Sequence, residues 1–228
     1  GNFDLLLRQS GLVWLPDTTT LALESPFDFA KQGELYIPPL TASPKQPEAH
    51  TEAVAEWLPK LIAADEAVGT LVLFTSRKQM NEVAMRLPEE YLPLLLIQGE
   101  IPKSALLEKH AKALAEGRAS IIFGLDSFAE GLDLPGEACV HVIIVKLPFS
   151  MPDNPIEKTQ NRWIEKRGGN PFIEVTVPEA GIKLIQAVGR LIRTENDYGR
   201  VTILDNRIQT QRYGKQLLAN LPPFKRIG

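Results

Sequence analysis

The chain has 228 residues, a formal net charge of −3 and a single cysteine. That length is enough for one α/β domain with a sizeable core. The net charge excludes a broad basic field for nucleic acid, so any nucleic-acid site has to be local.

No run reaches the roughly 18 apolar residues that a membrane helix needs, and no signal peptide is visible. The single cysteine fits a reducing compartment. We therefore expect a cytoplasmic protein with no membrane partner. Cys139 opens an apolar run, which predicts a buried, inert thiol rather than a nucleophile.

Apolar runs and helical patterns alternate along the chain. Five apolar runs are continuous, which is typical of strands buried on both faces of a parallel sheet. They span residues 70–74, 92–98, 120–124, 140–145 and 200–204. Helical patterns span residues 77–87, 103–117, 179–193 and 209–221. The alternation predicts an α/β fold with a doubly wound, mainly parallel sheet and helices on both faces.

Two stretches interrupt this alternation. Residues 38–50 are rich in proline and polar residues and predict a loop. Residues 147–178 predict an irregular insertion with one short helix around 158–166. We expect an N-terminal arm over residues 1–48 and one domain over residues 49–228.

Ligands of open α/β sheets bind outside the carboxyl ends of the strands. The first predicted strand is followed by Thr75, Ser76 and Arg77. Two hydroxyls and a guanidinium at a strand-to-helix turn suit a phosphate, and the alternative is a simple helix cap.

An acidic loop follows the third predicted strand. Its carboxylates, with one from the insertion, suggest a metal site, but their spacing matches no ligand motif and no histidine is near. They are Asp126, Glu130, Asp133, Glu137 and Asp153. Gly131 and Gly136 permit tight turns there. The alternative is an acidic surface loop.

The helical pattern at 179–193 carries polar groups on one face. At about 100° per residue, Gln186, Arg190 and Arg193 fall within a sector of about 60°. Gly189 costs about 1 kcal/mol of helix stability relative to alanine, which a close approach to the backbone would explain. The guanidinium fork suits phosphate oxygens, and the alternative is a solvated polar face. A separate apolar stripe is expected to pack on the sheet, formed by Leu184, Ile185, Val188, Leu191 and Ile192.

The insertion mixes basic and aromatic side chains at Arg162, Trp163, Lys166 and Arg167. This mixture suits stacking of a nucleic-acid strand. The alternative is that Trp163 pins the insertion to the core. The three histidines offer no ligand geometry and are expected to be exposed or core residues: His50, His110 and His141.

Several segments together resemble the helicases of superfamily 2. "QAVGRLIR" (186–193) is similar to their motif VI, "DSFAEGLDLPG" (126–136) to motif V in its XPD-like and DinG-like form, and "LVLFTS" (71–76) to motif IV. Other DinG-like stretches are "ESPFDF" (24–29), "LLLIQGE" (94–100), "KLPFSMPDNP" (146–155) and "PFIEVTVPEAGIKLIQ" (171–186). Each motif alone is weak, but together they follow the family's order along essentially the whole chain.

The chain departs from the family in one respect. It has no G-x-x-x-x-G-K-[ST] phosphate loop and no Asp-Glu box followed by histidine. Its first residues resemble the stretch that follows the family's first motor lobe. The resemblance therefore implies a RecA-like C-terminal lobe of a longer helicase. The family's four-cysteine iron–sulfur element belongs to the first lobe, and one cysteine cannot hold a cluster.

The resemblance implies an ATP-dependent 5′–3′ DNA helicase that uses ATP and Mg²⁺ in a cleft between this lobe and the first one. Arg190 and Arg193 are the expected catalytic arginines. Expected ATP-site residues are Gln186, Gly189, Glu130, Gly131 and Asp133. Expected contacts to single-stranded or forked DNA are Thr75, Ser76, Arg77, Gln98 and Ser127.

The isolated fragment is expected to be inactive. Two other interpretations stay open. One is a non-enzymatic nucleic-acid-binding module that kept the helicase fold. The other is the helicase lobe of a nuclease-fused DinG relative.

Overall fold

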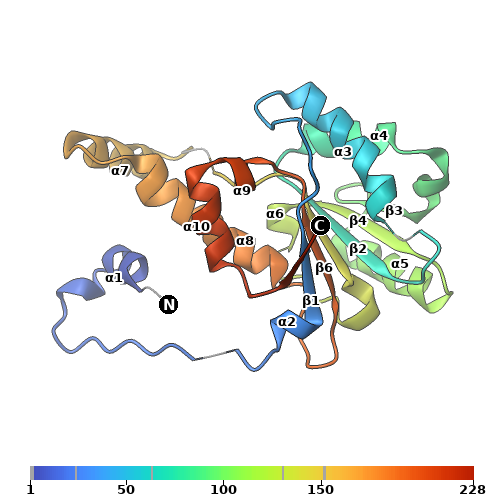
Figure 1. Ribbon diagram of the computed structural model, residues 1–228, viewed down its shortest axis with the longest axis horizontal. Coiled ribbons are helices and arrows are strands. Elements are labelled where there is room, and N and C mark those ends of the chain that lie inside the picture. The colour runs from blue at the N-terminus through green and yellow to red at the C-terminus, as the bar shows by residue number, and fades with distance from the viewer. Residues whose placement is uncertain (1–2, 24, 63, 130, 151–152) are drawn as a thin grey trace.

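The computed structural model describes residues 3–23, 25–62, 64–129, 131–150 and 153–228. They form a seven-stranded sheet of parallel strands in the order β3-β4-β2-β5-β6-β1-β7 (Figure 1). The strands are β1 (Gly33–Tyr36), β2 (Gly69–Phe74), β3 (Leu95–Ile97), β4 (Ser120–Leu125), β5 (His141–Ile144), β6 (Gly199–Ile203) and β7 (Lys225–Ile227). The predicted α/β fold with a parallel sheet is confirmed.

Helices connect the strands and cover the sheet. The longer ones are α3 (Pro47–Leu61), α4 (Arg77–Arg86), α5 (Lys103–Ala115), α7 (Pro155–Lys166), α8 (Val177–Val188) and α10 (Arg212–Asn220). The shorter ones are α1 (Asp4–Ser10), η1 (Leu12–Trp14), α2 (Phe29–Gln32), η2 (Glu89–Leu94), α6 (Asp126–Ala129), η3 (Gly136–Cys139), η4 (Phe172–Thr176) and α9 (Arg207–Thr210). The π-helical turn η4 runs directly into α8.

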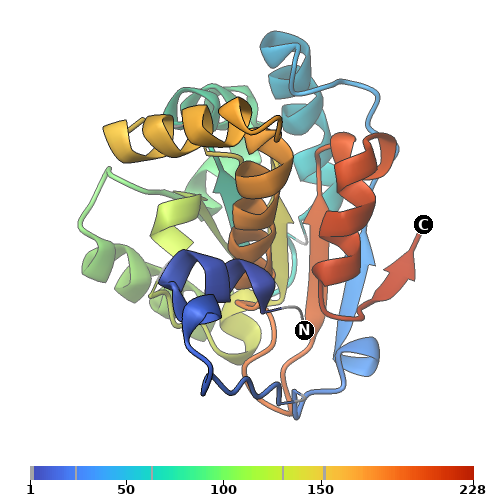
Figure 2. The ribbon, with the colours of Figure 1, turned by 90° about the vertical axis from the view of Figure 1, so that its left-hand side faces the viewer.

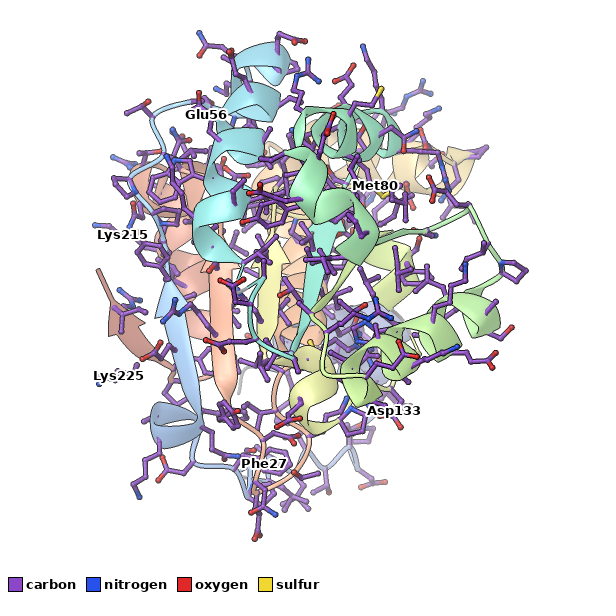
Figure 3. All side chains as sticks on the ribbon, turned by 90° about the vertical axis from the view of Figure 1, so that its right-hand side faces the viewer. Phe27, Glu56, Met80, Asp133, Lys215 and Lys225 are labelled. Atoms are coloured by element: carbon purple, nitrogen blue, oxygen red, sulfur yellow. The ribbon has the colours of Figure 1, made fainter. Side chains whose placement is uncertain are left out.

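Consecutive side chains of the central strands enter two different core clusters. Leu71 and Leu73 of β2 pack in the cluster that also holds side chains of α5, α8 and α10. Val72 and Phe74 pack in the cluster built with α3 and α4, which lie across the face of the sheet seen in Figure 3. All four side chains are buried. The continuous apolar runs are therefore strands with both faces covered, as the sequence predicts.

Three elements differ from the sequence prediction. Helix α3 begins at Pro47, inside the predicted loop, because proline suits the first turn of a helix. Strand β3 is only three residues long, since Pro93 and its neighbours form η2. Strand β1 lies within the predicted N-terminal arm and pairs with both β6 and β7.

Helix α8 ends at Val188, five residues before the predicted helix end. After Gly189 the backbone turns more tightly, with the N–H groups of Arg190 and Leu191 bonded to carbonyls three residues back. The carboxylate of Asp197 then accepts hydrogen bonds from the backbone N–H groups of Arg193 and Thr194, at 2.7 and 2.8 Å. Arg190 and Arg193 therefore follow the helix instead of lying on its face. The predicted apolar stripe is also wrong at one position, because Ile185 is 38% exposed.

A buried ion pair anchors the insertion at the carboxyl end of β6. Asp205 is fully buried, pairs with Arg207 at 2.6 Å and accepts a hydrogen bond from the Leu147 backbone N–H. Arg207 lies over the ring of Phe149, at 5.3 Å from its centroid. The first residues of the insertion are therefore held where the strand ends.

The three histidines and the cysteine belong to the core, as expected. His50 bonds the Leu204 carbonyl, and His110 and His141 bond Ser120 and Thr202. Burial lowers the pKa of all three histidines, that of His141 to about 4. Burial raises the pKa of the Cys139 thiol to about 12. Among the described residues, no helix has the length and apolar character to cross a membrane.

Candidate nucleotide and strand site

A cavity of about 250 Å³ opens at the carboxyl ends of β2 and β4. Thr75 follows β2, Asp126 and Ser127 follow β4, and α8 closes the other side. The side chains that α8 contributes are Lys183, Gln186, Ala187 and Arg190. The end of β2, the end of β4 and helix α8, which are far apart in the sequence, thus meet around one cavity.

Asp126 is the residue of this cavity whose pKa is unusual. Burial raises the pKa of its carboxyl to about 6, although the nearby Lys183 ammonium acts in the opposite direction. Lys183 also contacts the hydroxyl of Ser150, at the end of the segment that leaves β5. The cavity therefore contains hydroxyl, amide and cationic groups beside a carboxyl that is neutral below pH 6.

Two other predicted strand contacts, Arg77 and Gln98, line a second hollow of about 760 Å³ between α4 and the turn after β3. The Ser76 hydroxyl caps α4 by accepting from the Gln79 backbone N–H at 3.5 Å. Arg77 donates to the Gln98 carbonyl at 3.2 Å, and the side chain of Gln98 accepts from the Leu125 N–H at 2.8 Å. Ser76 and Gln98 thus have structural roles, while the Arg77 side chain is exposed.

Beyond the end of α8, the two arginines converge on the loop that follows α6. Arg190 Nη1 donates to the Leu132 carbonyl at 3.0 Å, and Arg193 Nη2 donates to the same carbonyl at 2.5 Å. Arg193 also forms an ion pair with Asp133, whose side chain is 77% exposed. Arg193 Nε is buried and has no hydrogen-bond partner among the described residues. The pair is thus held by the chain itself but keeps unused donor capacity.

Asp197 fixes the turn that presents Arg193. It accepts from the Gly136 N–H at 3.2 Å as well as from Arg193 and Thr194. Burial opposes its ionisation, but these hydrogen bonds outweigh burial and lower the pKa of Asp197. Gly131, at the start of the arginine-binding loop, has a φ of +69°, a conformation that favours glycine.

The residues that line the cavity and the loop that binds Arg193 lie toward opposite edges of the sheet. Strands β5 and β6 are parallel, so the chain has to return between them from the carboxyl edge to the amino edge, and α8 makes that return. Thr75 and Ser127 lie at the carboxyl edge. Asp133 lies in the lower part of the molecule in Figure 3, and Glu56 of α3 lies in the upper part. We therefore distinguish a strand-end cavity from an arginine turn, formed by residues 189–197 and the loop 131–134.

Only some predicted site residues come together. Thr75, Ser127, Gln186 and Arg190 share the strand-end cavity, and Arg190 also belongs to the arginine turn with Arg193 and Asp133. Glu130 lies outside the described residues. No described group of three or more histidine, cysteine or carboxylate side chains suits a metal ion.

Sequence reasoning missed three contributors to these sites. Lys183 gave no motif signal, although it lies three residues before Gln186 on the same helix. Asp126 opens the motif V-like stretch and the acidic loop, but neither pattern assigns it a role of its own. Asp197 acts through the fold of the turn, which its position in the sequence does not reveal.

Comparisons with known proteins show to which family the chain belongs. A family model described as the helicase C-terminal domain matches residues 60–224. The chain is 46% identical over 232 residues to the ATP-dependent DNA helicase DinG of Photobacterium profundum, covering 99% of this chain and 32% of the relative. It is 38% identical over 225 residues to DinG of Escherichia coli, covering 98% and 31%. The chain thus spans about a third of the length of these curated relatives.

Solved structures share the fold. An XPD helicase structure covers 86% of this chain and 35% of its own, with a TM-score of 0.62 and 22% identity. The structure of Xpd4 from S. tokodaii covers 94% of this chain and 41% of its own, with a TM-score of 0.64 and 16% identity. At these identities the likeness concerns the fold, and it supports the RecA-like architecture.

Proposed function

Because the chain belongs to the helicase C-terminal domain family, we propose that it is the second motor lobe of a DinG-type ATP-dependent DNA helicase. In this proposal the whole protein moves 5′ to 3′ along a single strand. The observation that carries the proposal is the convergence of Arg190 and Arg193 on one loop, with the buried Nε of Arg193 unpartnered among the described residues.

ATP would occupy the cleft between this lobe and the first one. The first lobe would supply the phosphate loop and the Mg²⁺ ligands, because the described part of this chain offers neither. The iron–sulfur element, where a relative has one, would also belong to the first lobe, since Cys139 is buried here. Mg²⁺ supplies neutralisation of phosphate charge during transfer.

On closure of the lobes, Arg190 and Arg193 would exchange the Leu132 carbonyl and the Asp133 carboxylate for the γ-phosphate. Their charges would then stabilise the oxygens of the transferring group, an effect worth about 10³–10⁵ in rate in other phosphate-loop enzymes. Gln186 would contact the phosphate or the attacking water. Gly189 and Gly131 would let the two backbones approach the nucleotide, with Glu130 as a further cleft residue.

The strand would bind at the carboxyl edge. Thr75, Ser127 and the exposed Arg77 are placed to contact the phosphate backbone, which positions a strand without reading its sequence. Ser76 and Gln98 would contribute through the turns that they hold. ATP-driven closure and release of the lobes would then move the strand, as a hinge motion coupled to hydrolysis.

The test is single-strand-stimulated ATP hydrolysis by the full-length protein, with wild type beside Arg190→Ala. We expect kcat to fall by about 10³ or more while ATP still binds. Arg86→Ala is the matched control, because Arg86 is an exposed, ion-paired arginine on α4. An unchanged kcat in Arg190→Ala would contradict the arginine assignment. A wild type without turnover would leave a nucleic-acid-binding module.

A further inference from the structure

A third hollow, separate from the strand-end cavity and from the hollow beside α4, lies between the N-terminal segment and α7. Its volume is about 650 Å³, within the range of pockets that hold small molecules. Two tryptophans from distant parts of the sequence line it, Trp14 at the end of η1 and Trp163 on α7. We call it the tryptophan hollow; Arg8, Val13, Gln160 and Arg167 complete most of its wall. Figure 2 shows α1 and α7 on one side of the molecule, near α8.

Both tryptophans are unusually exposed. Trp14 is 84% exposed and Trp163 is 61% exposed. The neighbouring Ile164 is only 3% exposed and attaches α7 to the core. Trp163 therefore does not pin the insertion, and that alternative from the sequence is wrong. Two large aromatic rings at the surface of one hollow indicate a binding role, since exposed apolar patches often mark ligand sites.

The ring of Trp163 is held in place without being buried. The guanidinium carbon of Arg167 lies 4.4 Å from the ring centroid, and Arg167 is ion-paired with Glu174 of η4. A guanidinium over a tryptophan face is attractive and restrains the ring. One face of Trp163 is thus supported by Arg167, and the 61% exposure of the side chain leaves the ring accessible to a flat ligand.

The charges around the hollow favour an anionic ligand. Arg8 and Arg167 line it, and the carboxylate of Glu174 is already paired with Arg167. On α7 the exposed cations Lys158, Arg162 and Lys166 outnumber the carboxylates Glu157 and Glu165. This local basic character contrasts with the net charge of −3 for the whole chain. Aromatic faces combined with guanidinium groups are the chemistry that holds unpaired bases and their phosphates.

The hollow is connected to the strand-end cavity by one continuous helical segment. Val175 of η4 lines the hollow, and Lys183 of α8 lines the cavity. Eight residues separate them, which corresponds to about 12 Å along a helix. A strand lying along this segment would reach both places.

We propose that the tryptophan hollow is a second strand-binding site, in which an unpaired base stacks on Trp163 or Trp14 and its phosphate contacts Arg8 or Arg167. The site rests on the proposed function, because it requires a protein that binds single-stranded nucleic acid. Stacking on a tryptophan accepts every base, so the site holds a strand without sequence preference.

The experiment measures binding of end-labelled oligothymidylate to the full-length protein. Trp163→Ala and Trp14→Ala should each weaken binding roughly five- to a hundred-fold, the range for aromatic-to-alanine changes at stacking positions. Trp163→Phe keeps an aromatic face and should retain most of the affinity. Ile156→Ala is the matched control, because Ile156 is 79% exposed on the same helix and does not line the hollow.

A second measurement does not depend on any variant. A strand carrying 5-iodouracil should form a photo-crosslink to Trp14 or Trp163 of the wild-type protein. If the wild-type protein binds the strand without a crosslink to either tryptophan, and both alanine variants bind the strand as tightly as the wild type, the hollow is no strand site. The proposed function then still stands. Tryptophans covered by another part of the full-length chain would give this same result. If the wild type binds no strand, the proposed function fails as well.

Discussion

The strand-end cavity lies beside α8 and the arginine turn follows the end of that helix, but the side chains of the two sites are held differently. The cavity is open, and Thr75, Ser127 and Lys183 line it directly. At the arginine turn, both guanidinium groups are already bonded to the loop 131–134. Under the proposed function, strand binding would need little rearrangement, whereas catalysis would require the arginines to change partners. A motor lobe that withholds its arginines until the lobes close avoids premature hydrolysis.

The largest expected effect is on the rate of ATP hydrolysis, and it distinguishes the arginine turn from the strand-end cavity. Arg193→Ala should lower the kcat of strand-stimulated ATP hydrolysis by about 10³, because a charge on the transferring phosphate is lost. Ser127→Ala should leave kcat nearly unchanged at saturating strand and weaken strand affinity about ten-fold, the lower end of the value of one hydrogen bond to a charged group. Steady-state kinetics over a strand titration distinguishes the two. Equal effects of both variants on kcat would break the distinction.

A second prediction concerns the Asp205–Arg207 ion pair at the carboxyl end of β6. Asp205→Ala leaves Arg207 unpaired at a largely buried position and should lower the free energy of unfolding by about 3–5 kcal/mol. Urea denaturation followed by circular dichroism measures the change. Glu34→Ala is the control, because the Glu34–Arg200 pair is partly exposed and should contribute about 1 kcal/mol or less. A similar loss in both variants would mean that Asp205 does not anchor the insertion.

A third prediction uses pH to probe the cavity. The pKa of Asp126 is raised to about 6, so its carboxyl is neutral below that pH and negative above it. Strand affinity should therefore fall about three- to ten-fold as pH rises through 6, because the new charge repels phosphate. The three histidines do not line this cavity, and burial lowers the pKa of each of them.

The control for this pH effect is Asp126→Asn, which cannot ionise. Fluorescence anisotropy with a labelled strand at several pH values should give a flat profile for this variant. A wild-type profile that the substitution does not alter would assign the pH dependence to another group.

The smallest expected effect is at the arginine turn. Asp133→Asn removes an ion pair in which the carboxylate is 77% exposed, so the free energy of unfolding should change by about 1 kcal/mol or less. The same urea measurement applies. A loss above about 3 kcal/mol would show that Asp133 is a structural residue, and the picture of a readily exchanged arginine partner would then be wrong.

Periodicity alone predicted the parallel sheet and the principal helices, because buried strands and amphipathic helices leave strong patterns. It failed where a single local contact decided the outcome. The predicted helix over 179–193 stops at Val188, and the backbone N–H groups of Arg193 and Thr194 bond the Asp197 carboxylate instead of continuing the helix. Strand β1 gave no pattern, since four residues at the far side of the sheet are too short to show one.

The motif letters by themselves indicated a helicase lobe and named Gln186, Arg190 and Arg193 as its functional residues. Motifs of this kind are short and local, so they can be read without a structure. Only the tertiary structure showed that Asp126 and Lys183 share a cavity, that Leu132 and Asp133 hold the arginines, and that Trp14 meets Trp163 across a hollow. These contacts join residues far apart in the chain, and their chemistry arises from burial and proximity, which no short stretch of sequence contains.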